Sequence, residues 1–334
     1  MFFSRRDNRQ AQATLEAAQH VLTGEARYWH LRALIGEREG RWAAARADYQ
    51  RAFDFDAPGT AEFLTVHFLH LRQYEDARRV IAVAQASNRL AVVVPDAWTR
   101  FSEHADIASA RQVLEAALAR RPAPDARVVG LLAQFEWFDG HAERALELVS
   151  RMDPTGAWLA PNFRFPAAIV AGDVLQTSGR SAEARRRYAE ALAVLESRRQ
   201  AHPDDPKVLA AMGLAYAGLG QPAEAVQHGR RAVELISRAR DATENPLYLY
   251  LLARVHARLG QVADAARVLD EMFEAPGFYS EAWVARDPSF EALRADSGYA
   301  ARLERWATRK GPVLLAPAEG RTAGSASAGA RDSQ

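Results

Sequence analysis

The sequence contains no cysteine among its 334 residues, so disulfide bonds, thiolate metal sites and cysteine nucleophiles are excluded. Lysine is nearly absent as well, because Lys207 and Lys310 are the only two and all other Lys/Arg positions are arginine. The 43 basic and 42 acidic residues leave a formal net charge of +1. No overall electrostatic field therefore recruits nucleic acid or an anionic membrane to this chain.

Long apolar runs are missing too. No stretch approaches the roughly 20 consecutive apolar residues that a helix needs to span a bilayer. The first residues, Met1 to Asp7, become charged at once and lack the apolar core of a secretory signal peptide. We expect a soluble, cytoplasmic protein that does not insert into a membrane.

Catalytic motifs are also missing. The sequence has no glycine-rich phosphate loop, no dinucleotide-binding fingerprint, no H-E-x-x-H zinc motif and no G-x-S-x-G nucleophile turn. Glu37 and Glu39 lie two residues apart, hence on different faces of a helix, which does not suit acid–base catalysis. We therefore predict no catalytic residues, no cofactor and no enzymatic activity.

Two histidines form the best candidate for a metal site. His67 and His70 lie three residues apart and share one helix face. No carboxylate or third histidine follows at matching spacing, so a site would need Glu62 or His30 to approach in space. Because such pairs more often pack within or beside a groove, we predict no metal.

What the sequence does contain is a repeat. An alanine recurs at intervals of 32 to 41 residues, with a mostly apolar residue four positions later and Ala or Met seven positions later. Such residues share one helix face, and alanine there lets two helices approach closely. Glycine precedes five of these alanines by five residues, which suits a left-handed turn between two helices. The repeated alanines are Ala11, Ala45, Ala77, Ala110, Ala145, Ala184, Ala225 and Ala265.

A period of this length indicates stacked helix pairs, because one pair cannot bury its apolar face alone. We predict an all-α, right-handed solenoid with no sheet. Residues 1–25 form an N-terminal half-repeat whose apolar face we expect to be partly uncovered, since its first helix has no room. Residues 26–280 form an array of about seven helix pairs. Residues 281–309 form capping helices, and residues 310–334, rich in Gly, Ala and Ser, form a disordered tail.

Three local features refine this division. An irregular stretch at 155–166, with two prolines, marks the weakest joint of the array. Two of the later second helices are expected to be long, spanning 182–200 and 222–240. The pair Asp287–Pro288 is expected to cap and begin a short helix near the end.

One unit is similar to a known family. Seven residues of the sixth unit resemble the tetratricopeptide signature W-x2-L-G-x2-Y, A-x3-F and A, with four identities and a departure at the Phe position. The resemblance covers roughly residues 6–280 and implies a right-handed superhelical solenoid of tetratricopeptide-like helix pairs. The seven residues are Leu209, Met212, Gly213, Tyr216, Ala225, Gly229 and Ala232.

The end of the array is similar to a second, narrower group. The dipeptides Asp241–Ala242 and Leu259–Gly260 and the segment Asp287–Arg294 resemble the end of bacterial signalling proteins. In those proteins a tetratricopeptide array follows a serine/threonine kinase or a winged-helix DNA-binding domain. Kinase motifs are missing here, so the resemblance extends to the array and not to the activity.

In proteins that this chain resembles, the first helices of the repeats line a concave groove that binds peptides or other proteins. The resemblance implies a non-enzymatic protein–protein interaction scaffold, and the mixed cationic and aromatic groove favours a partner segment with acidic and apolar residues. The expected groove residues are Arg27, His30, Glu62, Arg127, Gln134, Trp137, Lys207, Tyr250 and Arg254.

Two alternatives remain open. The chain is alternatively the regulatory or sensor portion of a bacterial kinase or transcription regulator, with the effector domain missing or on another chain. A weaker alternative is a repeat array that contacts nucleic acid, against which the near-neutral charge argues.

Overall fold

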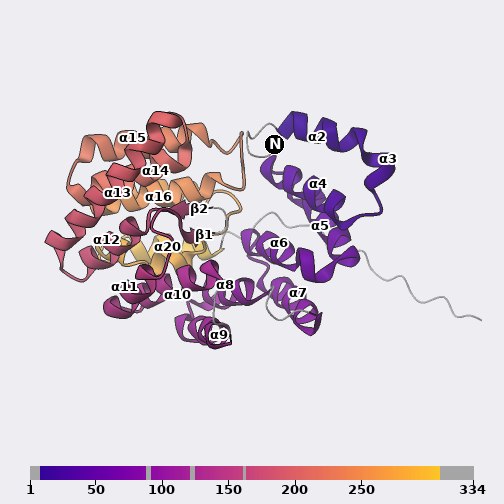
Figure 1. The fold of residues 1–334 in the computed structure, drawn as a ribbon, viewed down its shortest axis with the longest axis horizontal. Helices are drawn as coiled ribbons and strands as arrows, with labels where there is room; N and C mark the ends of the chain where they lie inside the picture. Colours follow the sequence, from indigo (N-terminus) through magenta and orange to yellow (C-terminus); the bar gives the residue numbers. More distant parts are fainter. Residues whose placement is uncertain (1–7, 88–91, 121–124, 161–162, 309–334) are drawn as a thin grey trace, which may run out of the picture.

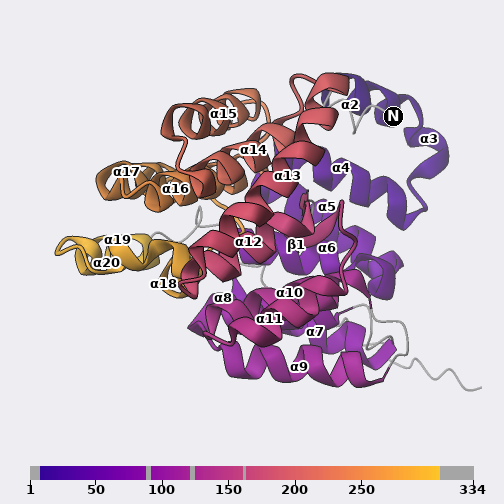
Figure 2. The ribbon, with the colours of Figure 1, turned by 60° about the vertical axis from the view of Figure 1, so that its left-hand side comes forward.

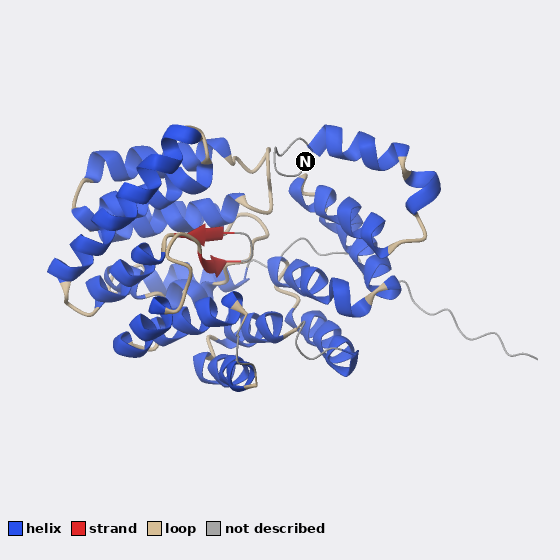
Figure 3. Ribbon diagram, viewed as in Figure 1, coloured by secondary structure: helices blue, strands red, loops and turns tan. Residues whose placement is uncertain are grey.

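The computed structural model describes residues 8–87, 92–120, 125–160 and 163–308. These residues are mostly helical and stack as consecutive antiparallel pairs (Figures 1 and 3). The prediction of an all-α, right-handed superhelical solenoid of tetratricopeptide-like helix pairs is confirmed. The tail predicted at 310–334 lies outside the described residues.

Seven helix pairs make up the array within the described part of the chain. The first helices are α4 (Ala26–Arg38), α6 (Ala57–His70), α8 (Val93–His104), α10 (Ala126–Phe138), α12 (Ala167–Thr177), α14 (Pro206–Leu219) and α16 (Asn245–Arg258). The second helices are α5 (Trp42–Phe55), α7 (Tyr74–Ser87), α9 (Ile107–Ala119), α11 (Ala142–Ser150), α13 (Ser181–Ala201), α15 (Pro222–Leu235) and α17 (Val262–Met272). The long α13 matches its prediction, whereas α15 ends five residues before the predicted Arg240.

The repeated alanines pack helix against helix, as predicted. Ala45, Ala184 and Ala225 are fully buried, and Ala11, in the half-repeat, is 5% exposed. At the sixth pair the approach is closer still, because a Cβ atom added to Gly213 would lie 3.1 Å from the Ala225 carbonyl oxygen. Glycine at position 229, where the family signature has Phe, therefore belongs to an unusually tight contact between α14 and α15.

Each of the seven pairs turns through one residue with a positive φ. Five of these residues are the predicted glycines, Gly40, Gly140, Gly179, Gly220 and Gly260, with φ between 72° and 83°. The second and third pairs instead use non-glycine residues, which cost roughly 1–2 kcal/mol in this left-handed region. These two are Arg72 (φ 58°) and Ala105 (φ 54°).

The irregular stretch at 155–166 forms a small antiparallel ribbon. Strand β1 (Ala157–Ala160) pairs with β2 (Phe163–Phe165), with a register irregularity between Trp158 and Ala160. The expectation that the chain contains no sheet is corrected at this point. Turn-rich sequence with two prolines does not continue a helix, so its backbone groups pair with each other instead.

The N-terminal end of the array carries α2 (Asn8–Ala17) and the one-turn helix α3 (Gln19–Leu22). Ala11 and Leu15 of α2 pack on Tyr28 and Ile35 of α4 in a small cluster of their own. Val21 of α3 stays 81% exposed. Among the described helices, none combines the length and the apolar character needed to cross a bilayer.

The C-terminal helices do more than cover the end of the array. They are α18 (Glu281–Arg286), the 3-10 turn η1 (Pro288–Phe290), α19 (Glu291–Arg294) and α20 (Tyr299–Thr308). The Asp287 carboxylate accepts a hydrogen bond from the Ser289 N–H, as the predicted cap requires. Helix α18 lies beside α8, more than 170 residues earlier in the chain (Figure 2). The solenoid therefore curls back on itself around its own C-terminal residues.

Candidate interaction surface

The inner side of the solenoid is largely occupied by residues 276–294, which we call the inserted segment. Trp283 of this segment packs edge-on against Phe101 of α8, with ring centroids 4.8 Å apart. Its indole N–H donates a 3.1 Å hydrogen bond to the Ser102 hydroxyl. Phe290 is completely buried. The inserted segment is thus bound inside the array much as a peptide ligand would be.

Buried charges hold the other side of the inserted segment. The Arg254 guanidinium lies 3.2 Å from the Asp287 carboxylate, and the Tyr250 hydroxyl donates a 2.7 Å hydrogen bond to the same carboxylate. Arg254 also bonds to Asp173 of α12 at 2.6 Å. Burial opposes ionisation of Asp173, but Arg258 and Arg254 beside it hold its pKa below the ordinary value. The Asp173 carboxylate is therefore ionised and paired inside the protein.

Four of the predicted groove residues are buried, two of them against the inserted segment. Gln134 and Trp137 of α10 are 6% and 5% exposed, and Tyr250 and Arg254 of α16 are 2% and 4% exposed. The prediction that these four side chains face an open groove is wrong in this conformation. Tyr250 and Arg254 do contact a segment with acidic and aromatic residues, as expected of the partner, but this segment belongs to the chain itself.

A second group of predicted groove residues stays accessible on the first two repeats and the start of α10, and we call it the open section. It consists of Arg27 and His30 of α4, Glu62 and Phe63 of α6, and Arg127 of α10. Glu62 and Arg127 form an ion pair of 2.6 Å that joins α6 to α10. Arg27 is exposed, and His30, Glu62 and Arg127 are partly exposed. The structure therefore brings together the predicted groove residues of three different repeats.

Phe63 gives the open section its apolar centre. Its ring meets the His30 imidazole edge to face, with centroids 4.0 Å apart, yet 42% of the residue is exposed. Burial lowers the pKa of His30, against the opposing effect of Glu37, so the imidazole is neutral at neutral pH. The pair presents a combined aromatic surface without a charge. Sequence reasoning missed Phe63, whose only signal is a large apolar residue directly after a predicted groove position.

The large apolar side chains that stay exposed cluster in one part of the molecule. Among the described residues, the four exposed ones all belong to helices α3 to α7. Single exposed apolar residues are common, so among the four only a residue that also lies beside predicted groove residues is a candidate for partner contact. The four are Val21, Phe55, Phe63 and Val83. The remaining predicted groove residue, Lys207, is partly buried at the start of α14.

The two histidines weighed as metal ligands lie in a buried polar cluster. The carboxylate beside them is Glu37, which lies 2.6 Å from His67 Nδ1, whereas Glu62 pairs with Arg127 instead. The Tyr49 hydroxyl donates a 2.9 Å hydrogen bond to Glu37 as well. Within the described ranges no three His, Asp or Glu residues are arranged to hold a metal ion. The cluster links α4, α5 and α6 as part of the packing.

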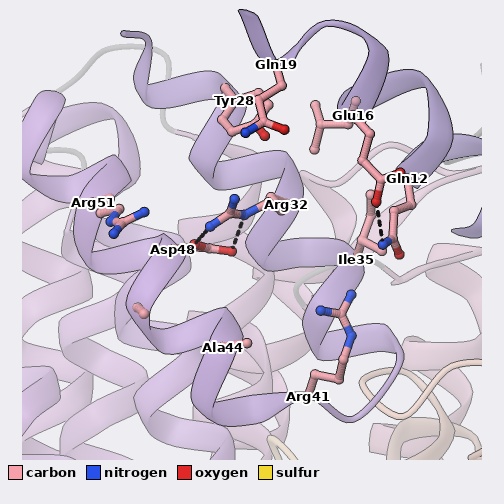
Figure 4. A pocket seen from close by; sticks show the side chains of 12 residues that line it. Gln12, Glu16, Gln19, Tyr28, Arg32, Ile35, Arg41, Ala44, Asp48 and Arg51 are labelled. Carbon is pink, nitrogen blue, oxygen red and sulfur yellow. Dashed lines mark hydrogen bonds and ion pairs between the residues drawn. The ribbon is translucent and has the colours of Figure 1, made fainter. Parts of the chain in front are cut away.

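Three of the hollows in the described part of the chain lie at joints between repeats. The first, of about 430 Å³, lies between α2, α4 and α5, where Arg32 bonds to Asp48 at 2.7 Å (Figure 4). The other two, of about 450 and 360 Å³, lie between α7, α8 and α9 and between α11, α12 and α13. Each lies between two successive second helices above a first helix. Their recurrence at equivalent joints marks them as a consequence of the repeat and its small residues rather than as one specialised site.

Comparison with known proteins gives a family match in the later repeats. Residues 170–242 and 228–277 match a family described as tetratricopeptide repeat. These residues extend from α12 to just beyond α17 and make up less than half of the chain. No curated protein matches the sequence.

Several solved structures match most of the chain at low identity. A structure of Naa15/Naa10 bound to HypK-THB shares 13% identity with a TM-score of 0.31, covering 91% of this chain and 59% of that chain. The P58(IPK) TPR domain shares 13% with a TM-score of 0.25, covering 92% and 96%. Yeast Tom70 shares 12% with a TM-score of 0.28, covering 85% and 69%. This chain thus spans less than two thirds of the first of them, and scores this low carry no conclusion on function.

Proposed function

We propose that this chain is a non-enzymatic protein–protein interaction scaffold that holds a segment of a partner protein on the open section. The tetratricopeptide match of residues 170–277 supports an interaction role, since arrays of this family commonly bind peptides or proteins. A net charge of +1 favours a protein over a nucleic acid as the partner. The cytoplasmic location stays a prediction.

The observation that carries the proposal is the exposure of Phe63. Among the described residues, it is the one exposed large apolar side chain that lies on a first helix of the array. Polar groups surround it, namely the ion pair of Glu62 with Arg127 and the exposed Arg27. An apolar centre with a polar rim is the usual anatomy of a protein interface.

The geometry also restricts what the partner presents. The neutral His30 and Phe63 rings offer an aromatic surface for one apolar side chain, preferably aromatic or aliphatic. The ion-paired Glu62 and Arg127 at the edge orient the bound segment. They contribute little affinity of their own, as is usual for exposed charges at the rim of an interface. The expected partner is therefore an extended or helical segment with an apolar anchor and polar flanks.

The test compares two exposed apolar residues on adjacent helices. A photo-crosslinking amino acid placed at position 63 should capture the partner, and the same group at position 83 of α7 should not. With the captured protein purified, Phe63→Ala combined with His30→Ala should weaken binding more than tenfold. Val83→Ala is the matched control, because it removes an exposed apolar side chain, 54% exposed against 42% for Phe63, from a second helix.

Circular dichroism should show the same helical content for these variants, since none of the three side chains is buried. Binding that survives the double substitution and fails with Val83→Ala would move the interaction to the outer face and contradict the proposal.

A further inference from the structure

Two loops from the C-terminal half close onto helices of the first two repeats. The first loop joins α15 to α16, and there the Ala242 N–H donates a 2.8 Å hydrogen bond to the Arg38 carbonyl oxygen. Ala242 also packs with Trp42 and Leu71 in a small apolar cluster separate from the main core. The Arg38 guanidinium lies 3.6 Å from the Asp241 carboxylate. This contact spans about 200 residues of sequence.

The second loop follows α17 and leads into the inserted segment. The Gly277 N–H donates a 3.1 Å hydrogen bond to the His70 carbonyl oxygen. In return, the Arg72 guanidinium donates to the Gly277 carbonyl oxygen at 2.6 Å and to the Tyr279 carbonyl oxygen at 2.8 Å. It also lies 3.7 Å from the Glu281 carboxylate. One arginine fork thus donates to two carbonyl oxygens and lies beside a carboxylate, all within five residues of the second loop.

Arg72 occupies a backbone position that does not favour arginine. Five of the seven turns use glycine there, and Arg72 adopts φ 58°. A strained residue persists when its surroundings hold it in place, and such residues concentrate at sites that switch. The contacts of the Arg72 side chain explain why arginine stands at this position, because a glycine has no side chain to bond to the second loop. Ala105, the other non-glycine turn residue, has a methyl side chain that cannot form such hydrogen bonds, and its backbone N–H donates to the Phe101 carbonyl oxygen within its own turn.

We infer that these contacts form a clasp that sets the width of the open section. The clasp consists of Arg38, Trp42, Leu71 and Arg72 on one side and of residues 241–242 and 277–281 on the other. It joins the first two repeats with their preceding helices, residues 8–87, to the C-terminal half. The inference rests on the proposed function, because it concerns access to the same surface.

The placement of the open section makes its width depend on the clasp. His30, Glu62 and Phe63 lie on residues 8–87, whereas Arg127 lies on α10, beyond the joint at α7 and α8. Figure 1 shows helices α2 to α7 as one arm of the curled array, with the C-terminal helices across from it. When the clasp opens, this arm moves as a unit about that joint, separating Arg127 from Phe63 and admitting the partner. No helix pair has to unfold.

The absence of cysteine allows a direct distance measurement. Spin labels on Gln50→Cys and Gln227→Cys, exposed positions on α5 and α15, report the separation of the two sides by double electron–electron resonance. Arg72→Gly removes the fork while relieving the backbone, and should shift the distribution to longer and broader distances. Ala105→Gly is the matched control, since it relieves the same backbone conformation without touching the clasp, and should leave the distances unchanged.

Hydrogen exchange supplies the second readout. In Arg72→Gly the amides of Gly277 and Ala242 should exchange at least tenfold faster, while amides within α14 and α15 keep their protection. Ala242→Glu places a charge between Trp42 and Leu71 and opens the clasp from the opposite loop, so it should give the same pattern. If either variant accelerates exchange throughout the chain, or if neither alters the distances, the clasp is ordinary packing and the inference is wrong.

Capture by the crosslinker at position 63 separates this inference from the proposed function. Both clasp variants should raise the rate of capture severalfold. Longer distances with unchanged capture would overturn the regulatory role while leaving the binding surface intact. Loss of capture at position 63 in the unaltered chain would instead contradict the proposed function itself.

Discussion

Arg254 of α16 donates a 2.6 Å hydrogen bond to Asp173 of α12, across 81 residues of sequence. The same guanidinium pairs with Asp287 of the inserted segment at 3.2 Å. All three groups are buried, with side-chain exposures of 5%, 3% and 1%. One arginine thus pairs with two carboxylates and links α12 and α16 to the inserted segment.

Arg254→Met should destabilise the protein strongly. Methionine has a similar length but no charge, so Asp287 loses its arginine partner and Asp173 keeps only Arg258. Breaking a buried ion pair typically costs about 3–5 kcal/mol. Chemical denaturation should show the loss as a lower midpoint. Arg231→Ala, which removes an exposed arginine paired with Asp204, is the control and should not move the midpoint measurably. Equal midpoints for both variants would contradict the structural role of Arg254.

Gly218→Ala should also destabilise the fold. The Tyr188 ring lies between two helical glycines, so that an added Cβ at Gly218 would overlap the ring, and one at Gly172 would lie 2.6 Å from it. Because Gly172 blocks the opposite side, the ring cannot move away, and overpacking of this kind costs about 1–3 kcal/mol. Gly36→Ala is the control, since its Cβ would meet Ala45 at an ordinary 3.4 Å. Thermal unfolding should show a lower midpoint for Gly218→Ala alone.

Local features of the fold were predictable from the sequence, because each depends on neighbours within one repeat. The spacing of Ala225 from Gly220 indicates a helix pair and its turn, and both residues lie where that pattern requires. Arg72 shows the limit of this reasoning. Its turn geometry repeats that of the glycines, but its retention depends on a loop more than 200 residues away.

The occupant of the inner face was not predictable in the same way. Trp283 bonds to Ser102 across 181 residues, and no periodic pattern relates the two. Whether Trp137 and Tyr250 face solvent depends on how far the array curls, which is the sum of small rotations at every joint. The residue types of the groove were therefore predictable, whereas the insertion of the chain's own segment was not.

The buried histidine at the clasp should make stability depend on pH. Burial lowers the pKa of His70 from its ordinary value of 6.5 to about 4, outweighing Glu37, which raises it, and assisted by His67 and Arg72, which lower it. Between pH 6.5 and about 4, His70 is protonated in the unfolded chain but stays neutral in the folded chain. The free energy of unfolding therefore falls as the pH decreases through this range, by up to about 1.4 kcal/mol per pH unit.

The measurement is a series of denaturant titrations between pH 6.5 and 4.5, above the range in which Glu37 takes up its proton, since the pKa of Glu37 is lowered from 4.5. Over this range the His70 contribution amounts to about 2–3 kcal/mol. His70→Phe keeps an aromatic ring against Trp42 and Phe278 but removes the titrating group, so its stability should fall less steeply. His104→Phe, at a histidine whose side chain is 71% exposed, should retain the slope of the unaltered chain. Parallel slopes for His70→Phe and the unaltered chain would show that His70 is accessible to protons in the folded state, and hence that the clasp is already open in solution.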